Sequence, residues 1–216
     1  MVRDPSVPGK EQTAHQGATE PWLNLAAWVE CTEVEGPGRR FALWTQGCLL
    51  RCPGCCNPHM FELKARHLVP ARTVCNWIEE AHRKHDLEGI TLLGGEPLLQ
   101  ARGLALVAAS ARRLGLSVML FTGYTLDQLR HLDLPGTGEL LAQCDVVVDG
   151  PFRADQPETI RNWVGSANQR FHYLTDRYDS SIETDPRYRP SLEFRILADG
   201  TVQLVGHAAL VRRRFV

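Results

Sequence analysis

Apolar residues occur in short blocks whose spacing alternates between that of strands and that of helices. Two apolar runs, residues 22–34 and 40–47, are separated by the turn-forming sequence EGPGR and predict two strands or a hairpin. Two later segments have apolar residues three and four positions apart, the spacing of one helix face. These residues are Val74, Trp77, Ile78 and Ala81 in the first segment, and Leu104, Val107, Ala108 and Ala111 in the second.

Three short apolar runs, residues 89–95, 117–123 and 145–150, predict buried strands between and after these helices. Thr125 and Gln128 have the spacing of a capping box, which predicts a further helix start. Strands that alternate with helices indicate βαβ units, so we expect an α/β fold with a mostly parallel sheet. Residues 150–178 are expected to form a long loop. Residues 191–207, with Asp199 and Gly200 at the turn, are expected to form a C-terminal β-hairpin.

The chain begins with a segment that differs in composition from the rest. Residues 1–20 are rich in Pro, Gly, Gln and charged residues and lack an apolar signal region, so we expect a disordered leader. Residues 21–216 are expected to form a single domain. The formal net charge of −1 and the lack of a run of about 18 apolar residues favour neither a nucleic-acid nor a membrane partner.

Four loops with distinctive residues each follow a predicted strand. They are the cysteine-rich segment 48–56, Gly94–Pro97 (GGEP), Thr122–Tyr124 (TGY) and Asp149–Phe152 (DGPF). In parallel α/β sheets, functional groups gather on the loops after the C-terminal ends of the strands. We therefore expect all four loops to face one site.

The cysteine-rich loop carries Cys48, Cys52, Cys55 and Cys56 within nine residues. The chain has seven cysteines and no export signal, which favours a metal or redox site in a reducing cytoplasm over disulfides. One alternative is a structural zinc site, with Cys56 or His59 as the fourth ligand. The other is an iron–sulfur cluster held by three cysteines, which leaves one iron open to a small molecule. The isolated cysteines Cys31, Cys75 and Cys144 are interpreted as small buried hydrophobic residues.

The cysteine spacing C-x3-C-x2-C followed by GGEP resembles the radical S-adenosylmethionine (radical SAM) superfamily. Five segments are similar to the activating enzymes of glycyl-radical enzymes, and most similar to those of anaerobic ribonucleotide reductase. They are GPGRRFALWTQGCLLRCPGCCNP, GITLLGGEPL, VMLFTGYTLDQL, CDVVVDGPF and GSANQR, between about Glu35 and Arg170. The resemblance implies a partial (β/α) barrel of the radical SAM type.

The resemblance also implies a chemistry and a set of residues. A 4Fe-4S cluster bound by Cys48, Cys52 and Cys55 would reductively cleave S-adenosylmethionine to a 5′-deoxyadenosyl radical, and this radical would abstract hydrogen from a glycine of a partner glycyl-radical enzyme. The cluster itself would be the only catalytic group. Gly94, Gly95, Glu96 and Pro97 would bind the methionine moiety, Asn57 would contact the ribose, and Thr122 would be a further cofactor contact. A flavodoxin- or ferredoxin-type reductant would supply the electron.

Two departures from the family pattern leave alternatives open. The residue after the third cluster cysteine is usually aromatic or histidine, but here it is Cys56, so the adenine would pack elsewhere, for example on Phe61. We expect Cys56 to stay outside the cluster, because adjacent side chains diverge. The leader and the closing hairpin extend the chain beyond the ribonucleotide reductase activators. The alternatives are therefore radical SAM modification of a peptide or small metabolite, and a zinc-stabilised binding module without catalysis.

Overall fold

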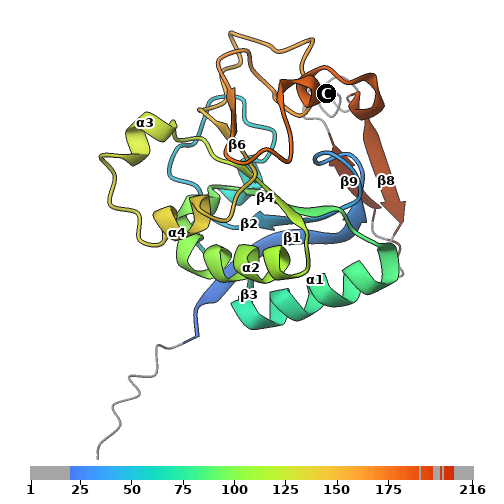
Figure 1. Cartoon of the computed structure of the whole chain (residues 1–216). Helices are drawn as coiled ribbons and strands as arrows, with labels where there is room; N and C mark the ends of the chain where they lie inside the picture. The colour runs from blue at the N-terminus through green and yellow to red at the C-terminus, as the bar shows by residue number, and fades with distance from the viewer. Residues whose placement is uncertain (1–19, 190, 197–199, 201, 207–216) are drawn as a thin grey trace, which may run out of the picture.

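The computed structural model describes residues 20–189, 191–196, 200 and 202–206 of the 216-residue chain (Figure 1). Nearly all of the leader expected over residues 1–20 therefore lies outside the described residues, as does Asp199 of the expected hairpin turn. The strands are β1 (Trp22–Thr32), β2 (Arg40–Thr45), β3 (His67–Pro70), β4 (Gly89–Gly94), β5 (Ser117–Phe121), β6 (Val146–Asp149), β7 (Arg170–Tyr173), β8 (Leu192–Ile196) and β9 (Val202–Gly206). The α-helices are α1 (Ala71–His85), α2 (Ala101–Arg113), α3 (Leu126–Leu129) and α4 (Thr137–Leu141).

Seven strands form one sheet in the order β3-β1-β2-β4-β5-β6-β7. The four central strands, β2, β4, β5 and β6, are parallel to one another, which confirms the expected parallel arrangement for the centre of the sheet. Strands β1 and β3 at one side and β7 at the other pair antiparallel with their neighbours. The sheet thus has β3 and β7 at its two edges.

Alternate residues of the central strands supply two different cores, as expected from the strand period of two. One set, which includes Phe41, Leu43 and Leu92, packs against the apolar faces of α1 and α2. Figure 1 shows these two helices side by side along one face of the sheet. The other set, which includes Ala42 and Trp44, forms a separate cluster with Val205 of β9. The hairpin therefore covers part of the face opposite the helices.

The predicted helices and the predicted strands are confirmed. The residues expected on the apolar face of α2 are all buried, and the helix ends where Gly115 adopts a φ of 79° and donates its N–H to Arg112 O at 3.0 Å. The capping box of Thr125 and Gln128 is present at α3. The hairpin of β8 and β9 is present as well.

The expectation of one uninterrupted loop over residues 150–178 is wrong, because β7 lies within it. This strand is only four residues long, and it forms by pairing with β6, for example Arg170 opposite Asp149. Strand β3 and helix α4 were not predicted either, since each is four or five residues long and depends on a neighbour. No helix among the described residues is long and apolar enough to cross a membrane.

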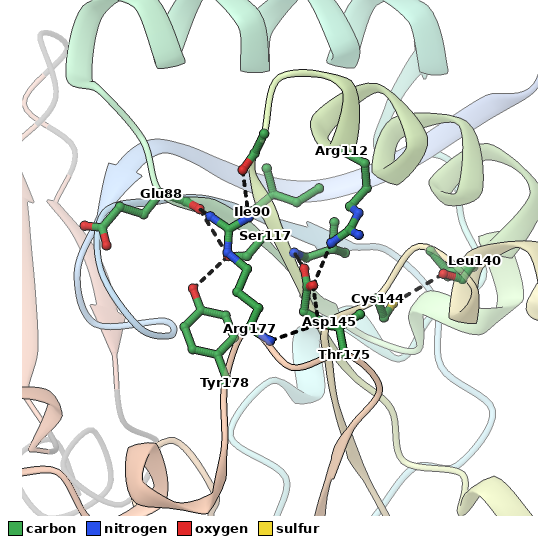
Figure 2. A network of polar contacts seen from close by, with 12 residues as sticks. Glu88, Ile90, Arg112, Ser117, Leu140, Cys144, Asp145, Thr175, Arg177 and Tyr178 are labelled. Carbon is green, nitrogen blue, oxygen red and sulfur yellow. Dashed lines mark hydrogen bonds and ion pairs between the residues drawn. The ribbon is translucent and has the colours of Figure 1, made fainter.

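A polar network closes the end of the sheet at which the parallel strands begin (Figure 2). Asp145, which is 1% exposed and precedes β6, accepts hydrogen bonds from Arg112 Nη1 and Thr175 Oγ1, both at 2.6 Å. Ser117 at the start of β5 shares a hydrogen bond of 2.9 Å with the hydroxyl of Tyr178. These contacts fasten the segment after β7 to the sheet, while the opposite end carries the four distinctive loops.

Candidate functional site

One cavity of about 660 Å³ is lined by all four of the loops singled out from the sequence. The loops contribute Cys48, Cys52, Cys55, Cys56, Asn57, Gly94, Gly95, Glu96, Thr122, Gly123, Gly150 and Phe152. The cavity lies on the face of the sheet opposite α1 and α2, because Trp44, Met60 and Val205 of the second core also line it. Its volume is within the range of about 300–1,000 Å³ that is usual for small-molecule sites. The expectation that the four loops face one site is confirmed.

The cysteine-rich loop leaves β2 and is closed at its base by its own backbone. Gly47 donates its N–H to Met60 O at 2.9 Å, and Cys48 donates its N–H to Phe61 O at 3.2 Å. Within the loop, Gly54 has a φ of 75°, a left-handed conformation that glycine adopts without steric cost. The loop therefore turns back on itself and carries its cysteines along the cavity wall.

The three expected cluster ligands differ in exposure. Cys48 is buried, and Cys52 and Cys55 are half-buried. Burial raises the pKa of Cys48 and of Cys52, although backbone N–H groups, including that of Phe152 at Cys52, act in the opposite direction. Each of these two thiols also interacts electrostatically with Cys55. We infer that binding of a metal centre releases protons here, because thiolates are the ligands.

Zinc and iron–sulfur centres place different demands on the cysteines of this loop. A zinc ion needs its four ligands around one point, at about 2.0–2.3 Å, whereas the cysteines of an iron–sulfur cube each bind a different iron. In the described part of the chain, no three His, Cys, Asp or Glu side chains are grouped so as to hold one metal ion. Cys48, Cys52 and Cys55 line a common cavity instead. Cys56, the exposed fourth cysteine, is on the rim of the same cavity.

The GGEP loop lies directly against the cysteine-rich loop. Gly95 donates its N–H to Thr45 O, and Glu96 donates its N–H to Gly47 O, both at 2.8 Å. A Cβ atom on Gly95 would lie 2.2 Å from Gly47 O and 2.9 Å from Met60 O, so only glycine fits. The backbone of Gly95 therefore lies directly against the neighbouring loop. The expected contact of Gly95 with the methionine moiety stays a prediction.

Glu96 joins the GGEP loop to the TGY loop. Its side chain is fully buried, and its carboxylate accepts hydrogen bonds from Thr122 Oγ1 at 2.8 Å, Gly123 N at 2.9 Å and Leu98 N at 3.0 Å. Burial raises the pKa of this carboxyl to about 7, against the effect of the three donors. Pro97 follows and begins a short 3-10 helix, Pro97–Gln100, which Glu96 caps. The carboxylate therefore fixes the loops, in addition to lining the cavity.

Asn57 and Phe61 both line the cavity next to the cysteines, where the sequence places them. The backbone N–H of Asn57 is directed at Cys55 Sγ, with a donor–acceptor distance of 3.4 Å. The guanidinium of Arg51 lies over the ring of Phe61, 5.9 Å from its centroid. The contacts of Asn57 and Phe61 with the adenosine moiety stay predictions.

Several residues of the segments singled out from the sequence are not among the cavity-lining residues of the described chain, including Pro97 of GGEP, Asp149 of DGPF and Asn168 of GSANQR. The buried carboxylate of Asp149 accepts the N–H of Leu126 at 2.7 Å and lies 3.0 Å from His172 Nε2. Asn168 donates its Nδ2–H to Pro151 O at 2.8 Å. The side chains of Asp149 and Asn168 therefore shape the loops around the cavity.

Sequence reasoning missed the wall that the C-terminal hairpin contributes. Four residues of β9 line the cavity: Val202, Leu204, Val205 and Gly206. Glu35, in the turn between β1 and β2, also lines it and accepts the N–H of Gly206 at 2.9 Å. Burial raises the pKa of Glu35 to about 8. Glu35 and Gly206 are 171 positions apart, so no local pattern in the sequence predicts their contact, although the hairpin itself was predicted.

Comparisons with known proteins agree with this geometry. Residues 34–172 match the family described as a 4Fe-4S single cluster domain. The anaerobic ribonucleoside-triphosphate reductase-activating protein of Enterobacteria phage T4 is 33% identical over 158 residues, which cover 71% of this chain and 96% of the relative. The protein of the same name from Vibrio cholerae is 32% identical over 71% of this chain and 99% of the relative, and that from Escherichia coli K12 is 29% identical over 70% and 99%.

The matched residues contain the cysteine-rich loop, GGEP and TGY, which together line the cavity. The chain therefore belongs to the radical SAM family of anaerobic ribonucleoside-triphosphate reductase-activating proteins, oxidoreductases whose cofactors are a 4Fe-4S cluster and S-adenosylmethionine.

Proposed function

We propose that this protein activates an anaerobic ribonucleoside-triphosphate reductase by abstracting hydrogen from a glycine of that enzyme. The observation that carries the proposal is the convergence of Cys48, Cys52, Cys55 and the GGEP loop on one cavity. The relatives of this name match this chain over almost their whole length, 96% and 99% for the first two. The glycyl-radical partner itself is inferred from their names.

The proposed chemistry is supplied by the bound cofactors. A 4Fe-4S cluster with one open iron would supply the electron that cleaves S-adenosylmethionine to methionine and a 5′-deoxyadenosyl radical. That radical would take a hydrogen atom from the glycine and give 5′-deoxyadenosine and a glycyl radical. The protein's part is to hold, orient and shield the reactants. Cys48, Cys52 and Cys55 would be the cluster ligands, and Cys56 would remain outside the cluster.

The GGEP loop would position the methionine end of the cofactor. The carboxylate of Glu96 already accepts three internal hydrogen bonds, so backbone carbonyls of Gly94 and Gly95 are the better acceptors for the methionine ammonium. Thr122 would act on the cofactor by fixing Glu96, and Pro97 by fixing the turn. Asn57, whose backbone N–H lies 3.4 Å from Cys55 Sγ, would contact the ribose beside the cysteines.

The shape of the site supports the radical mechanism. We propose that the sheet, together with the loops on its inner face, corresponds to the partial barrel of the radical SAM type. The cavity is bounded by apolar side chains, among them Trp44, Leu93 and Phe121, which limit the access of water to a reactive radical.

A flavodoxin- or ferredoxin-type reductant would deliver the electron from the solvent side of the cysteine-rich loop. Three basic residues belong to that loop or follow it in the chain: Arg51 and Arg66 are exposed, and Lys64 is 63% exposed and paired with Glu62. Such a surface suits an acidic electron carrier. A cytoplasmic location is part of the proposal, because a reducing compartment suits a cysteine-bound metal or redox site.

Anaerobic reconstitution tests the proposal. Protein loaded with iron and sulfide should contain about four irons per chain, as a 4Fe-4S cluster requires. With dithionite and S-adenosylmethionine it should release 5′-deoxyadenosine, and with the reductase encoded in the same genome it should produce a glycyl radical detectable by electron paramagnetic resonance. Stoichiometric zinc that iron does not replace, with no cofactor cleavage, would contradict the proposal.

The cysteines provide a matched control. Replacing Cys48, Cys52 or Cys55 with serine should remove the cluster and all cofactor cleavage. Cys56→Ser changes a neighbouring cysteine in the same loop and should leave both intact. Loss of the cluster in the Cys56 variant, with retention in one of the others, would show that the ligand assignment is wrong.

A further inference from the structure

The C-terminal hairpin presents an unusual apolar surface. Its register pairs Phe194 with Leu204 and Ile196 with Val202 across the two strands. Directly paired residues lie on the same face of a two-stranded sheet, so these four side chains form one outer face. Three of them are strongly exposed: Phe194 is 55%, Val202 61% and Ile196 81% accessible to solvent. An apolar face of this kind is typical of an interaction site.

The opposite face of the hairpin fixes it to the body of the protein. Thr32 Oγ1 donates a hydrogen bond to Glu193 Oε2 at 2.5 Å, and Arg195 donates to the carbonyl of Cys31. Val205 is only 3% exposed and packs in the second core with Trp44. The contacts of the opposite face therefore fix the position of the outer face relative to the sheet.

The outer face continues into the cavity. Val202 and Leu204 line the cavity that contains the cysteines, and Val202 is at the same time largely exposed. A polypeptide that reaches the cavity past β9 would therefore contact the outer face. The hairpin also lies beyond residues 34–172, the part that matches the family model. The common chemistry of the family therefore does not account for it.

We propose that the outer face of the hairpin, formed by Phe194, Ile196, Val202 and Leu204, receives an apolar segment of the protein substrate next to its reactive glycine. This inference rests on the proposed function, since the occupant is the glycyl-radical partner. A protein substrate has to bring backbone atoms into the cavity, and the outer face offers the apolar contact area that a small cavity lacks. The hairpin would thus select the polypeptide that is activated, and the cysteine-rich loop would hold the cofactors that carry out the reaction.

Aspartate substitutions test the outer face. Ile196→Asp and Phe194→Asp place a charge at exposed positions that are outside the cavity lining. We expect each to weaken binding of the reductase by about tenfold or more, as loss of an interface anchor does. Glycyl-radical formation at subsaturating reductase should fall in proportion. The matched control is Leu174→Asp, at a 44% exposed residue that follows β7 at the far end of the sheet.

Cofactor cleavage without the reductase separates this inference from the proposed function. If wild-type protein does not cleave S-adenosylmethionine with dithionite, the proposed function fails. If it cleaves the cofactor and activates the reductase, but the hairpin variants bind and activate as well as the Leu174 control, only the inference is overturned. A hairpin variant that loses reductase-free cleavage would make the hairpin a cofactor lid, which also contradicts the inference.

The occupant can be identified by photo-crosslinking. Benzoylphenylalanine in place of Phe194 should form a crosslink to the reductase when the reductase and S-adenosylmethionine are both present. Mass spectrometry should locate that crosslink near the reactive glycine. Crosslinks only to a second copy of this chain, or only to its own residues, would show that another surface occupies the hairpin and would refute the proposal.

Discussion

Gly95→Ala gives the sharpest test of how the site is held together. The added methyl group would lie 2.2 Å from Gly47 O, a backbone atom that cannot move away as a flexible side chain does. The two loops have to separate, which breaks the bonds from Gly95 N to Thr45 O and from Glu96 N to Gly47 O. Two lost hydrogen bonds at about 1 kcal/mol each and an overpacking cost of about 1–3 kcal/mol predict a loss of about 3–5 kcal/mol.

The assay is anaerobic denaturation of the cluster-free protein, followed by iron analysis after reconstitution. Gly138→Ala is the matched control, because nothing lies within 4 Å of its added Cβ in α4. In a helix this change should be neutral or stabilise by up to about 1 kcal/mol. A Gly95 variant within about 0.5 kcal/mol of wild type, with normal iron content, would refute the view that this contact positions the cysteine-rich loop.

Three further changes have defined outcomes. Thr122→Val removes the hydroxyl that donates to Glu96 and should cost about 1–2 kcal/mol in denaturation, with a higher KM for S-adenosylmethionine; an unchanged KM would argue against a role at the cofactor. The pKa of Glu35 is raised from 4.5 to about 8, so the contribution of this side chain to stability is complete below pH 4.5 and declines as the pH rises to 8. The free energy of unfolding of wild type relative to Glu35→Gln should therefore fall over that interval. A difference that does not change with pH would contradict this prediction. Burial acts to raise the pKa of Asp145, but hydrogen bonds outweigh it and the pKa is lowered; relative to Asp145→Asn, wild type should therefore lose stability in acid, below the ordinary pKa of 3.8, and a difference that grows in acid would contradict this.

The location of the site could be predicted because it depends only on the direction of the parallel strands in the sheet. Each of the four loops follows a strand, and parallel strands place their C-terminal ends at one side of the sheet. Apolar blocks were enough to find β2, β4, β5 and β6, so the convergence of Cys48, Gly94, Thr122 and Gly150 followed without any side-chain detail. The helices were equally accessible, since an amphipathic pattern records burial against a sheet.

The features that the sequence did not predict depend on contacts between distant residues. Strand β7 has only four residues, in which Phe171 and Tyr173 alternate with polar residues, a pattern too short to stand out within a long polar segment. Its pairing with β6 decides that it forms a strand. Arg40 begins β2 and is fully buried, where it donates to Thr91 Oγ1 at 2.7 Å and Ser117 Oγ at 2.9 Å. An arginine at the start of a strand would ordinarily be expected at the surface. Its acceptors lie 51 and 77 positions away, beyond the range of any local pattern.

The cavity wall is formed by the four loops and by the C-terminal hairpin, and these two parts should tolerate substitutions differently. The loops that would hold the cofactors contact one another through Gly95, Glu96 and Thr122, so a substitution in one of them is felt by the others. The hairpin is anchored outside these loops, by the contacts of Glu193 and Arg195 with β1 and by the bond from Gly206 to Glu35. Phe194 and Ile196 of its outer face are exposed and are not among the cavity-lining residues, so we expect that they can vary while the geometry of the cysteines stays fixed. If the hairpin selects the partner, specificity can change independently of radical chemistry, and variants of Phe194 should alter which polypeptide is bound before they alter the rate of cofactor cleavage.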